Sequence, residues 1–343
     1  MVMVEGSVEG TRPWSQRRSR GRSLAIRESL PLAFCAVSAV VINPAVAGSQ
    51  GRALSQKVGG YVALTKPRII ELLLITTVPT MIVAERGLPG WWLMIATVVG
   101  GTMSAGGANA INMYVDRDID ALMERTSNRP LVTGVVTPRA ALTFAVSLEV
   151  AAFVFLWAFV NLLSAALAVA ACLFYVFVYT LWLKRTSSSN IVIGGAAGAA
   201  PVLIGWSSVT NSLGWTPVLL FGVIFFWTPP HFWALAIKYK DDYSRAEVPM
   251  LPSVATARAV GVQIVGYTVV VVATSIAVGP VADLGMIYLG TAALLGLGFL
   301  ALAIKVLRAP SPKVAMRLFT FSITYVTLLF GAMAADVLIG SRA

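Results

Sequence analysis

Long apolar runs follow one another from about residue 69 to the C-terminus, and short polar segments separate them. Each run is long enough to cross a hydrocarbon core of about 30 Å as an α-helix, because a helix rises about 1.5 Å per residue. The pattern predicts an all-α, polytopic membrane protein with nine transmembrane helices. The predicted spans are 69–86, 91–112, 140–160, 162–182, 190–209, 214–237, 259–279, 284–304 and 318–340.

Composition supports this class of protein. Hydrophobic residues make up 57% of the 343 residues and charged residues only 12%, about half the charge of an ordinary soluble domain. The chain has two cysteines, Cys35 and Cys172, and a single histidine, His231. A metal centre built from Cys and His is therefore excluded. A net charge of +11 could indicate nucleic-acid binding, but the placement of the charges indicates a membrane topology instead.

Basic residues are distributed as the positive-inside rule requires. With the N-terminus in the cytoplasm, 24 of the 26 Lys and Arg residues fall on the cytoplasmic side, and only Arg86 and Arg342 do not. An incorrect number of spans would scramble this alternation. We therefore expect a plasma-membrane protein with its N-terminus and its long polar loops cytoplasmic and its C-terminus outside.

The first 57 residues form a separate, basic segment. RRSRGR precedes the apolar stretch LPLAFCAVSAVVINPAVA, a pattern that resembles a secretory signal peptide. Cleavage there would leave four basic residues on the outer side, namely Arg52, Lys57, Lys66 and Arg68. A membrane span there would place six N-terminal arginines outside. Both outcomes conflict with the charge pattern. We expect a poorly ordered or membrane-surface extension over 1–57 and a transmembrane domain over 58–343.

Acidic residues gather in two cytoplasmic loops, 113–139 and 238–258. Together these loops hold seven of the 15 acids, namely Asp116, Asp118, Asp120, Glu124, Asp241, Asp242 and Glu247. Acids at a single helix end are usually a solvated cap that pairs with nearby arginines. Two such loops on one side of the membrane favour a functional site, because charge beside a bilayer is costly.

The spacing of these acids indicates which of them act together. Asn112, Asp116 and Asp120 are four residues apart, so a continuing helix places them on one face. Asp118 then points the other way. Adjacent carboxylates repel unless a cation lies between them, and Mg²⁺ prefers a few carboxylates completed by water and substrate phosphates. The second loop repeats the spacing with Lys238 and Asp242, which predicts a Mg²⁺ and diphosphate site.

Other residues suit the same chemistry, with structural alternatives that stay open. Lys66 and Arg68 precede the first span, and Lys184 and Arg185 end the fourth. These four residues could hold a diphosphate, or they could serve only the positive-inside signal and contact lipid phosphates. His231 in PPHFW is more often a packing residue, although it could lie beside a large aromatic substrate.

Several motifs resemble a known family. NMYVDRDIDALMERTSNRP resembles the NxxxDxxxD signature of the UbiA superfamily of intramembrane prenyltransferases. YVALTKPRIIELLL, YTLWLKRT, FFWTPPHFWALA and DDYSRAEVPMLP are similar to its haem-modifying branch, the protohaem IX farnesyltransferases. The likeness runs from about Tyr61 to the C-terminus. The superfamily signature alone would leave quinone and chlorophyll prenyltransferases open, and the last two motifs favour haem.

The resemblance implies a nine-helix bundle around a central cavity, with the active site on the cytoplasmic side. It implies Mg²⁺-dependent transfer of farnesyl from farnesyl diphosphate to a vinyl group of haem B, which gives haem O. A downstream haem-modifying membrane enzyme is then a candidate partner. By motif, Asp116, Asp120, Lys238 and Asp242 are the expected catalytic residues, and Asn112, Asp116, Asp120 and Asp242 the expected metal ligands. The expected substrate contacts are Asn112, Arg68, Arg125, Arg129, Lys184, Arg185 and Tyr243, with His231 on the haem side.

Two departures and two rival functions accompany this interpretation. Lys238 stands where the superfamily has the first Asp of a second DxxxD, and Glu247 stands where the haem branch commonly has Gly. A secondary transporter would also carry acids, but within its spans rather than at their cytoplasmic ends. A quinone-type prenyltransferase would share the diphosphate site and accept a phenolic acceptor instead of haem.

Overall fold

The protein is described by a computed structural model, which covers the backbone of residues 44–340 and the side chains of residues 54–67 and 75–340. Every regular element in that range is helical, as the apolar pattern predicts. The long elements are α1 (Pro44–Thr65), α2 (Pro67–Glu85), α3 (Trp91–Val115), α5 (Pro138–Phe159), α6 (Leu162–Leu173), α8 (Asn190–Thr210), α9 (Trp215–Lys238), α12 (Ala257–Val281), α13 (Met286–Arg308) and α14 (Pro312–Gly340). Most of the predicted extension 1–57 lies outside the described residues, and α1 runs through its predicted end.

All nine predicted spans coincide with long helices, but seven of these helices are long and apolar enough to cross a membrane within the described residues. The seven are α5, the run Leu162–Thr186, α8, α9, α12, α13 and α14. Of the other two helices, α2 enters this comparison only through its described stretch Ile75–Glu85, and α3 is long enough but less apolar. In α3 the reason is visible, because Gly100, Ser104, Gly106 and Asn109 are buried against neighbouring helices. Small and polar residues that serve helix packing lower the hydropathy of a helix.

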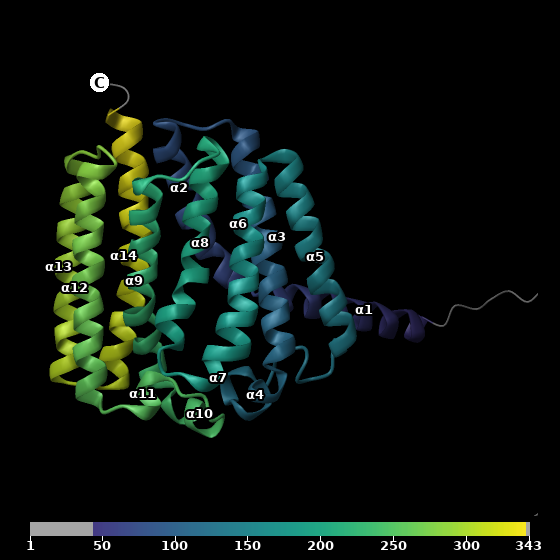
Figure 1. Cartoon of the computed structure of the whole chain (residues 1–343). Coiled ribbons are helices and arrows are strands. Elements are labelled where there is room, and N and C mark those ends of the chain that lie inside the picture. The colour runs from purple at the N-terminus through teal and green to yellow at the C-terminus, as the bar shows by residue number, and fades with distance from the viewer. Residues whose placement is uncertain (1–43, 341–343) are drawn as a thin grey trace, which may run out of the picture. The chain divides into compact units, whose positions relative to one another are not determined.

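Within the helical unit, α8 and α9 lie centrally between α5 on one side and α12 and α13 on the other (Figure 1). Burial agrees with this arrangement. Half or more of the apolar stretch is buried in α8 and α9, against 17% in α5. The outer helices instead expose large apolar side chains such as Val150, Trp157, Leu294 and Leu297, which suit a hydrocarbon solvent.

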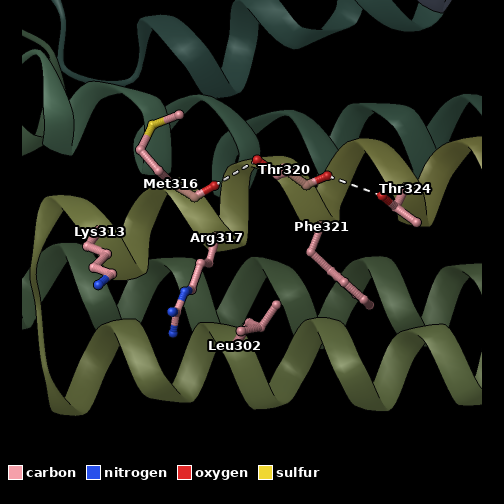
Figure 2. Close-up of a pocket in the computed structure, with 7 residues that line it drawn as sticks. All are labelled: Leu302, Lys313, Met316, Arg317, Thr320, Phe321 and Thr324. Carbon is pink, nitrogen blue, oxygen red and sulfur yellow. Dashed lines mark hydrogen bonds between the residues drawn. The ribbon is translucent and has the colours of Figure 1, made fainter.

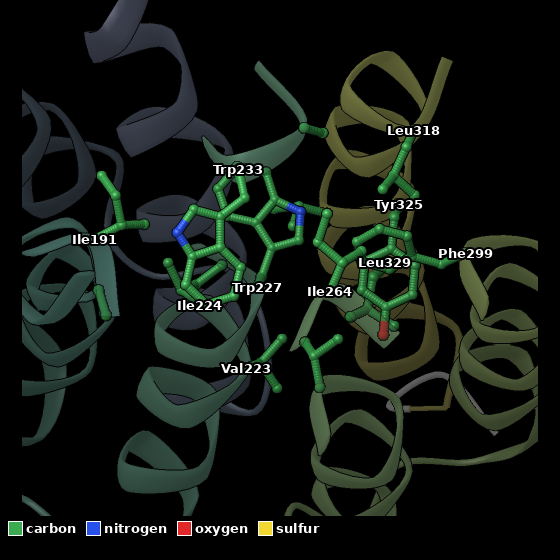
Figure 3. Packing of buried hydrophobic residues seen from close by; sticks show 14 of the residues in the cluster. Ile191, Val223, Ile224, Trp227, Trp233, Ile264, Phe299, Leu318, Tyr325 and Leu329 are labelled. Carbon is green, nitrogen blue, oxygen red and sulfur yellow. The ribbon is translucent and has the colours of Figure 1, made fainter. Parts of the chain in front are cut away.

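The main apolar core lies around α9. Trp227 and Trp233 of α9 belong to one buried cluster with Ile264 of α12, Phe299 of α13 and Tyr325 of α14 (Figure 3). All five side chains are almost completely buried. Such dense packing tolerates little displacement, so the end of α9, which carries part of the site, is held firmly.

A π-helical stretch interrupts the fourth predicted span. The helix that begins as α6 continues as η2 (Phe174–Leu183) and ends as α7 (Lys184–Thr186). Inside η2, the hydroxyl of Thr180 donates to the carbonyl of Tyr175, five residues earlier, at 2.8 Å. π-Helical turns are rare and occur frequently at functional sites, and η2 leads directly into the site described below.

An open groove of about 520 Å³ lies between α13 and α14 (Figure 2). It is lined by Leu302, Lys313, Met316, Arg317, Thr320, Phe321 and Thr324. None of the predicted site residues is among them. The groove is therefore separate from the acidic loops.

Candidate active site

The predicted site residues gather at one end of the helices. The short helices α4 (Arg117–Leu122) and α10 (Lys240–Arg245) follow α3 and α9, and Figure 1 places both beside α7 at the same end. The 3₁₀ turn η1 (Glu124–Thr126) continues the first loop. The fold thus brings together two acidic loops that are more than 100 residues apart in sequence.

The first loop has the geometry that its spacing predicts. Although α3 ends at Val115, helical hydrogen bonds continue from Asp116 N to Asn112 O and from Asp120 N to Asp116 O. Asn112, Asp116 and Asp120 are 3%, 0% and 2% exposed. Asp118 leaves the site, and its side chain is 62% exposed. The predicted separation of Asp118 from the other acids is confirmed.

Basic side chains enclose Asn112 and Asp116. Lys66 Nζ donates to Asn112 Oδ1 at 2.7 Å, and Asn112 Nδ2 donates to Asp116 Oδ2 at 2.7 Å. Lys184 forms a buried ion pair with the same carboxylate oxygen. Arg185 lies 3.8 Å from Asp116 Oδ1. Two lysines from separate segments therefore hold this pair, Lys66 at the Asn112 amide and Lys184 at the Asp116 carboxylate.

The remaining acids of the first loop are also paired. Arg129 Nη1 donates to Asp120 Oδ2 at 2.6 Å. Arg185 forms two parallel hydrogen bonds to Asp118, at 2.7 and 2.8 Å. This fork, together with minor backbone contributions, lowers the pKa of Asp118 to about 2. Arg185 is therefore oriented by Asp118 and reaches the site from its rim.

Lys66 lies in a strained and electropositive position. Its backbone has φ +53 at the junction of α1 and α2, a conformation that residues other than glycine adopt at a cost. Burial, and then the charges of Arg129 and Lys184, lower its pKa to about 7 despite the nearby carboxylates of Asp116 and Asp120. Such a local field favours the arrival of an anion. Arg68, the other basic residue of this segment, has a side chain outside the described residues.

The second loop lacks the i, i+4 stacking that its spacing predicts, and the catalytic role of Lys238 stays a prediction. Asp242 and Tyr243 are buried on α10 as expected. Lys238, however, is exposed at the end of α9 and lies over the ring of Tyr239 at 5.2 Å. Arg245, which sequence reasoning missed, forms the ion pair with Asp242. Because α9 ends at Lys238 and α10 begins at Lys240, the i, i+4 stacking assumed for Lys238 and Asp242 is lost.

Arg125 joins the two loops. Its backbone N–H donates to Asp242 Oδ2 at 3.4 Å. Its guanidinium lies 5.5 Å from the ring of Tyr239 and forms a hydrogen bond with Tyr243. Burial raises the pKa of Tyr243, so its hydroxyl stays protonated at neutral pH. The predicted assembly of the two acidic loops into a single site is supported by these contacts.

Two tyrosines of η2 complete the wall of the site and were not singled out by sequence reasoning. Tyr175 and Tyr179 stack with ring centroids 5.4 Å apart. Both lie within electrostatic range of Asp116, and Tyr179 also of Tyr243. Gly194 of α8 allows this, because a Cβ there would collide with the ring of Tyr179. The motif YTLWLKRT begins at Tyr179 and so included one of the two, whereas Tyr175 lies before it.

His231 lies in an aromatic stack between α9 and α14. Its ring is stacked between Trp227 at 4.2 Å and Phe319 at 4.5 Å. Ser322 donates its hydroxyl proton to Phe319 O, so its oxygen accepts a 2.7 Å hydrogen bond from Nδ1 of His231. These contacts describe a packing residue. The haem contact of His231 stays a prediction.

A pair of substitutions separates the two roles of His231. We expect His231→Phe and Ser322→Ala to lower the thermal midpoint by similar amounts, equivalent to about 1 kcal/mol, because each removes the same buried hydrogen bond. Neither should change the KM for a haem acceptor. A rise in that KM confined to His231→Phe would instead support the predicted haem contact. The measurements are thermal unfolding in detergent and steady-state kinetics.

Glu247, which stands where the haem branch commonly has glycine, has the backbone conformation of a glycine. Its φ is +52, in the left-handed region that glycine adopts without steric cost. The loop after α10 therefore keeps a geometry suited to glycine while holding a larger side chain.

The donor atoms of the site suit Mg²⁺ in one particular arrangement. Asp116 Oδ1 is buried and accepts no hydrogen bond, and the neighbouring ligand candidates all offer oxygen. Within the described residues, no three Asp, Glu, His or Cys side chains enclose a common point where a metal could bind. The residues therefore fit a Mg²⁺ ion that shares its ligands with a diphosphate and water, rather than a closed protein cage.

The all-helical membrane fold gathers acids and bases at one end of the bundle, an arrangement that suits an anionic substrate. The UbiA prenyltransferase family matches residues 73–328. The protohaem IX farnesyltransferase of Parafrankia sp. is 58% identical over 81% of this chain and 90% of that protein. That of Frankia alni is 54% identical over 83% of this chain and its own full length. The chain belongs to the UbiA prenyltransferase family.

Solved structures agree on the fold. A digeranylgeranylglyceryl phosphate synthase covers 82% of this chain and 99% of its own, with 17% identity and a TM-score of 0.69. A UbiA homologue from Archaeoglobus fulgidus, bound to DMAPP and Mg²⁺, covers 80% of this chain and 99% of its own, with 16% identity and a TM-score of 0.56. The chain is thus an integral membrane protein with the UbiA fold.

Proposed function

We propose that this chain transfers a farnesyl group from farnesyl diphosphate to a vinyl group of haem B and so makes haem O. The observation that carries the proposal is that two distant loops each bring a buried acid, Asp116 and Asp242, to the same end of the bundle among basic side chains, with Arg125 bonding from the first loop to Asp242 of the second. Relatives more than 50% identical to this chain are named protohaem IX farnesyltransferases. Their name supports haem as the acceptor.

Mg²⁺ is the proposed cofactor. Asn112, Asp116, Asp120 and Asp242 would hold it, and Asp116 Oδ1, which accepts no hydrogen bond, would be one of the ligand oxygens. When bound, Mg²⁺ withdraws electrons from the diphosphate and makes it a better leaving group. Because Asp116, Asp120 and Asp242 are each paired with a cation, binding requires those cations to move from carboxylate to phosphate.

The basic residues then act on the leaving diphosphate. Lys66, Lys184 and Arg129 are already held within reach of the acids. As the allylic carbon–oxygen bond breaks, the electron pair goes to the diphosphate, and these fixed charges stabilise it. Arg125 and Arg185 are proposed to contribute from the rim. Arg68 keeps this role as a prediction from its motif.

The carbocation is proposed to lie against η2. The stacked rings of Tyr175 and Tyr179 present negative faces that stabilise a cation and exclude water. The terminal vinyl carbon of haem attacks the farnesyl carbon and forms the new carbon–carbon bond. A water molecule then adds to the cation left beside the porphyrin and loses one proton, which supplies the hydroxyl group of haem O.

We propose that the site faces the cytoplasm from the plasma membrane, with the N-terminus cytoplasmic and the C-terminus outside. The alternation of basic segments along the chain supports this orientation. Lys184, Lys238 and the two acidic loops lie at one end of the helices, as a single cytoplasmic face requires.

The proposed activity is tested with purified protein in detergent. Farnesyl diphosphate and Mg²⁺ are supplied with either haem B or a hydroxybenzoate, and products are identified by mass spectrometry. We expect haem O, and no prenylated hydroxybenzoate. Prenylated hydroxybenzoate without haem O would assign the chain to the quinone-type branch. The absence of any prenylated product from either acceptor would contradict a prenyltransferase function.

A further inference from the structure

Thr180 occupies a position whose hydrogen bonds are fully determined. Its side chain is 0% exposed in η2, at the level of Asn112. The hydroxyl proton goes to Tyr175 O at 2.8 Å, so the oxygen can only accept from other groups. It accepts one N–H of the Asn112 amide at 3.1 Å.

This bond determines which way the Asn112 amide faces. One N–H of Nδ2 goes to Thr180 and the other to Asp116 Oδ2. The amide oxygen is left for Lys66, which has only donors. A reversed amide would place its oxygen against the lone pairs of Thr180 and its N–H groups against the ammonium of Lys66.

Thr180 differs from the other two partners because it is uncharged and internal. Lys66 and Asp116 are charged groups that a diphosphate and its metal would attract away from Asn112. Thr180 is held by the main-chain carbonyl of Tyr175, and because it is uncharged, neither the diphosphate nor the metal attracts it. It is the partner whose contact with Asn112 does not depend on whether substrate is present.

The π-helical turn makes this arrangement available. In an α-helix a threonine hydroxyl bonds the carbonyl three or four residues earlier, as Thr186 does with Trp182. Thr180 instead bonds the carbonyl five residues earlier, which the i→i+5 repeat of a π-helix brings within reach. The backbone N–H of Lys184 likewise donates to Tyr179 O, five residues earlier, and the Lys184 side chain pairs with Asp116.

We propose that Thr180 is a positioning residue that keeps the amide oxygen of Asn112 turned towards the metal and diphosphate. The proposal rests on the proposed function of Asn112 as a metal ligand. The proposal also gives the π-helical turn a purpose. The turn fixes the hydroxyl oxygen of Thr180, and the hydrogen bond to that oxygen determines which way the amide oxygen of Asn112 points. Thr180 itself touches neither metal nor substrate.

The test measures metal binding without turnover. Mn²⁺ replaces Mg²⁺ and is titrated by electron paramagnetic resonance in the presence of farnesyl S-thiolodiphosphate, an unreactive substrate analogue. Thr180→Val keeps the shape of the side chain and removes the acceptor. We expect it to weaken Mn²⁺ binding about tenfold, whereas Thr180→Ser should bind as the wild type does. Thr186→Val, on the exposed face of the same helix, is the matched control and should leave binding unchanged.

A second pair of variants keeps the test valid if Thr180→Val does not fold. Thr180→Cys differs from Thr180→Ser by one atom and offers only a weak acceptor. It should bind Mn²⁺ several-fold more weakly than Thr180→Ser at equal thermal stability. Equal Mn²⁺ affinity in these two variants, or in Thr180→Val and the wild type, would overturn the role of Thr180.

The outcome for Thr180 is distinguishable from that for the proposed function. A wild-type protein that makes haem O, with variants that bind Mn²⁺ equally, would refute only the positioning role. Mn²⁺ binding that depends on the hydroxyl oxygen at position 180, in a protein that does not prenylate haem, would support the positioning role of Thr180 and refute the proposed function. A wild-type protein that binds no Mn²⁺ with the analogue would refute both.

Discussion

Replacing Asp116 with asparagine is expected to reduce kcat for farnesyl transfer about 10³-fold, the scale of losing a preorganised electrostatic group in a site that excludes water. Asp116 is completely buried, its Oδ1 accepts no hydrogen bond, and its Oδ2 accepts from both Lys184 and Asn112. The substitution keeps the shape and removes the charge. It therefore removes a proposed metal ligand and leaves the ammonium of Lys184 without its anionic partner.

The matched control for Asp116 is two residues away. Asp118→Asn changes an acid of the same loop that is 62% exposed and faces Arg185. We expect its kcat to stay within about threefold of the wild type, because exposed ion pairs contribute little. The measurement is haem O formation against Mg²⁺ concentration for both variants. Similar losses in both would contradict the division of this loop into a buried site and an exposed rim.

Replacing Asp242 with asparagine is expected to reduce kcat about 10²-fold and to raise the Mg²⁺ concentration needed for half-maximal rate. Asp242 is buried, pairs with Arg245 and accepts the backbone N–H of Arg125. Its charge therefore joins the second loop to the first and is proposed to meet the metal. The expected loss of kcat is smaller than for Asp116→Asn, because the oxygen of an asparagine at position 242 can still accept the hydrogen bond from the backbone N–H of Arg125.

Asp241→Asn is the control for Asp242, because Asp241 is the adjacent acid and is exposed. We expect the activity and Mg²⁺ dependence of Asp241→Asn to match those of the wild type. Kinetics at several Mg²⁺ concentrations, with thermal unfolding to confirm folding, decide the result. An Asp242→Asn enzyme with normal Mg²⁺ dependence would show that the second loop does not share in metal binding.

Several features of the site could be predicted from local sequence because helix geometry is local. The four-residue spacing of Asn112, Asp116 and Asp120 implies one face, and hydrogen bonds continue through the end of α3 so that all three are buried together. The same periodicity separates Asp118. The apolar runs likewise give the positions of the long helices, because the bilayer sets their length.

Sequence reasoning failed where the chain leaves regular geometry. Lys238 and Asp242 are four residues apart, yet the helix breaks at Tyr239, so Lys238 is exposed and Arg245 takes its place beside Asp242. The predicted nine apolar spans exceed the seven found within the described residues, where α2 is represented only by Ile75–Glu85 and α3 is less apolar than the others. In α3, small and polar residues such as Gly107 and Asn109 serve helix contacts that hydropathy does not register.

The sequence by itself determined the class of protein, the position of its long helices and the two acidic loops that carry its charge, because these follow from hydrophobic length and helical period. Only the tertiary structure decided which cation meets which acid. Lys66, Lys184 and Arg129 come from three separate segments, and Thr180 reaches Asn112 across 68 residues through a π-helical turn. Contacts of this kind depend on how helices pack against one another, and no local pattern encodes them.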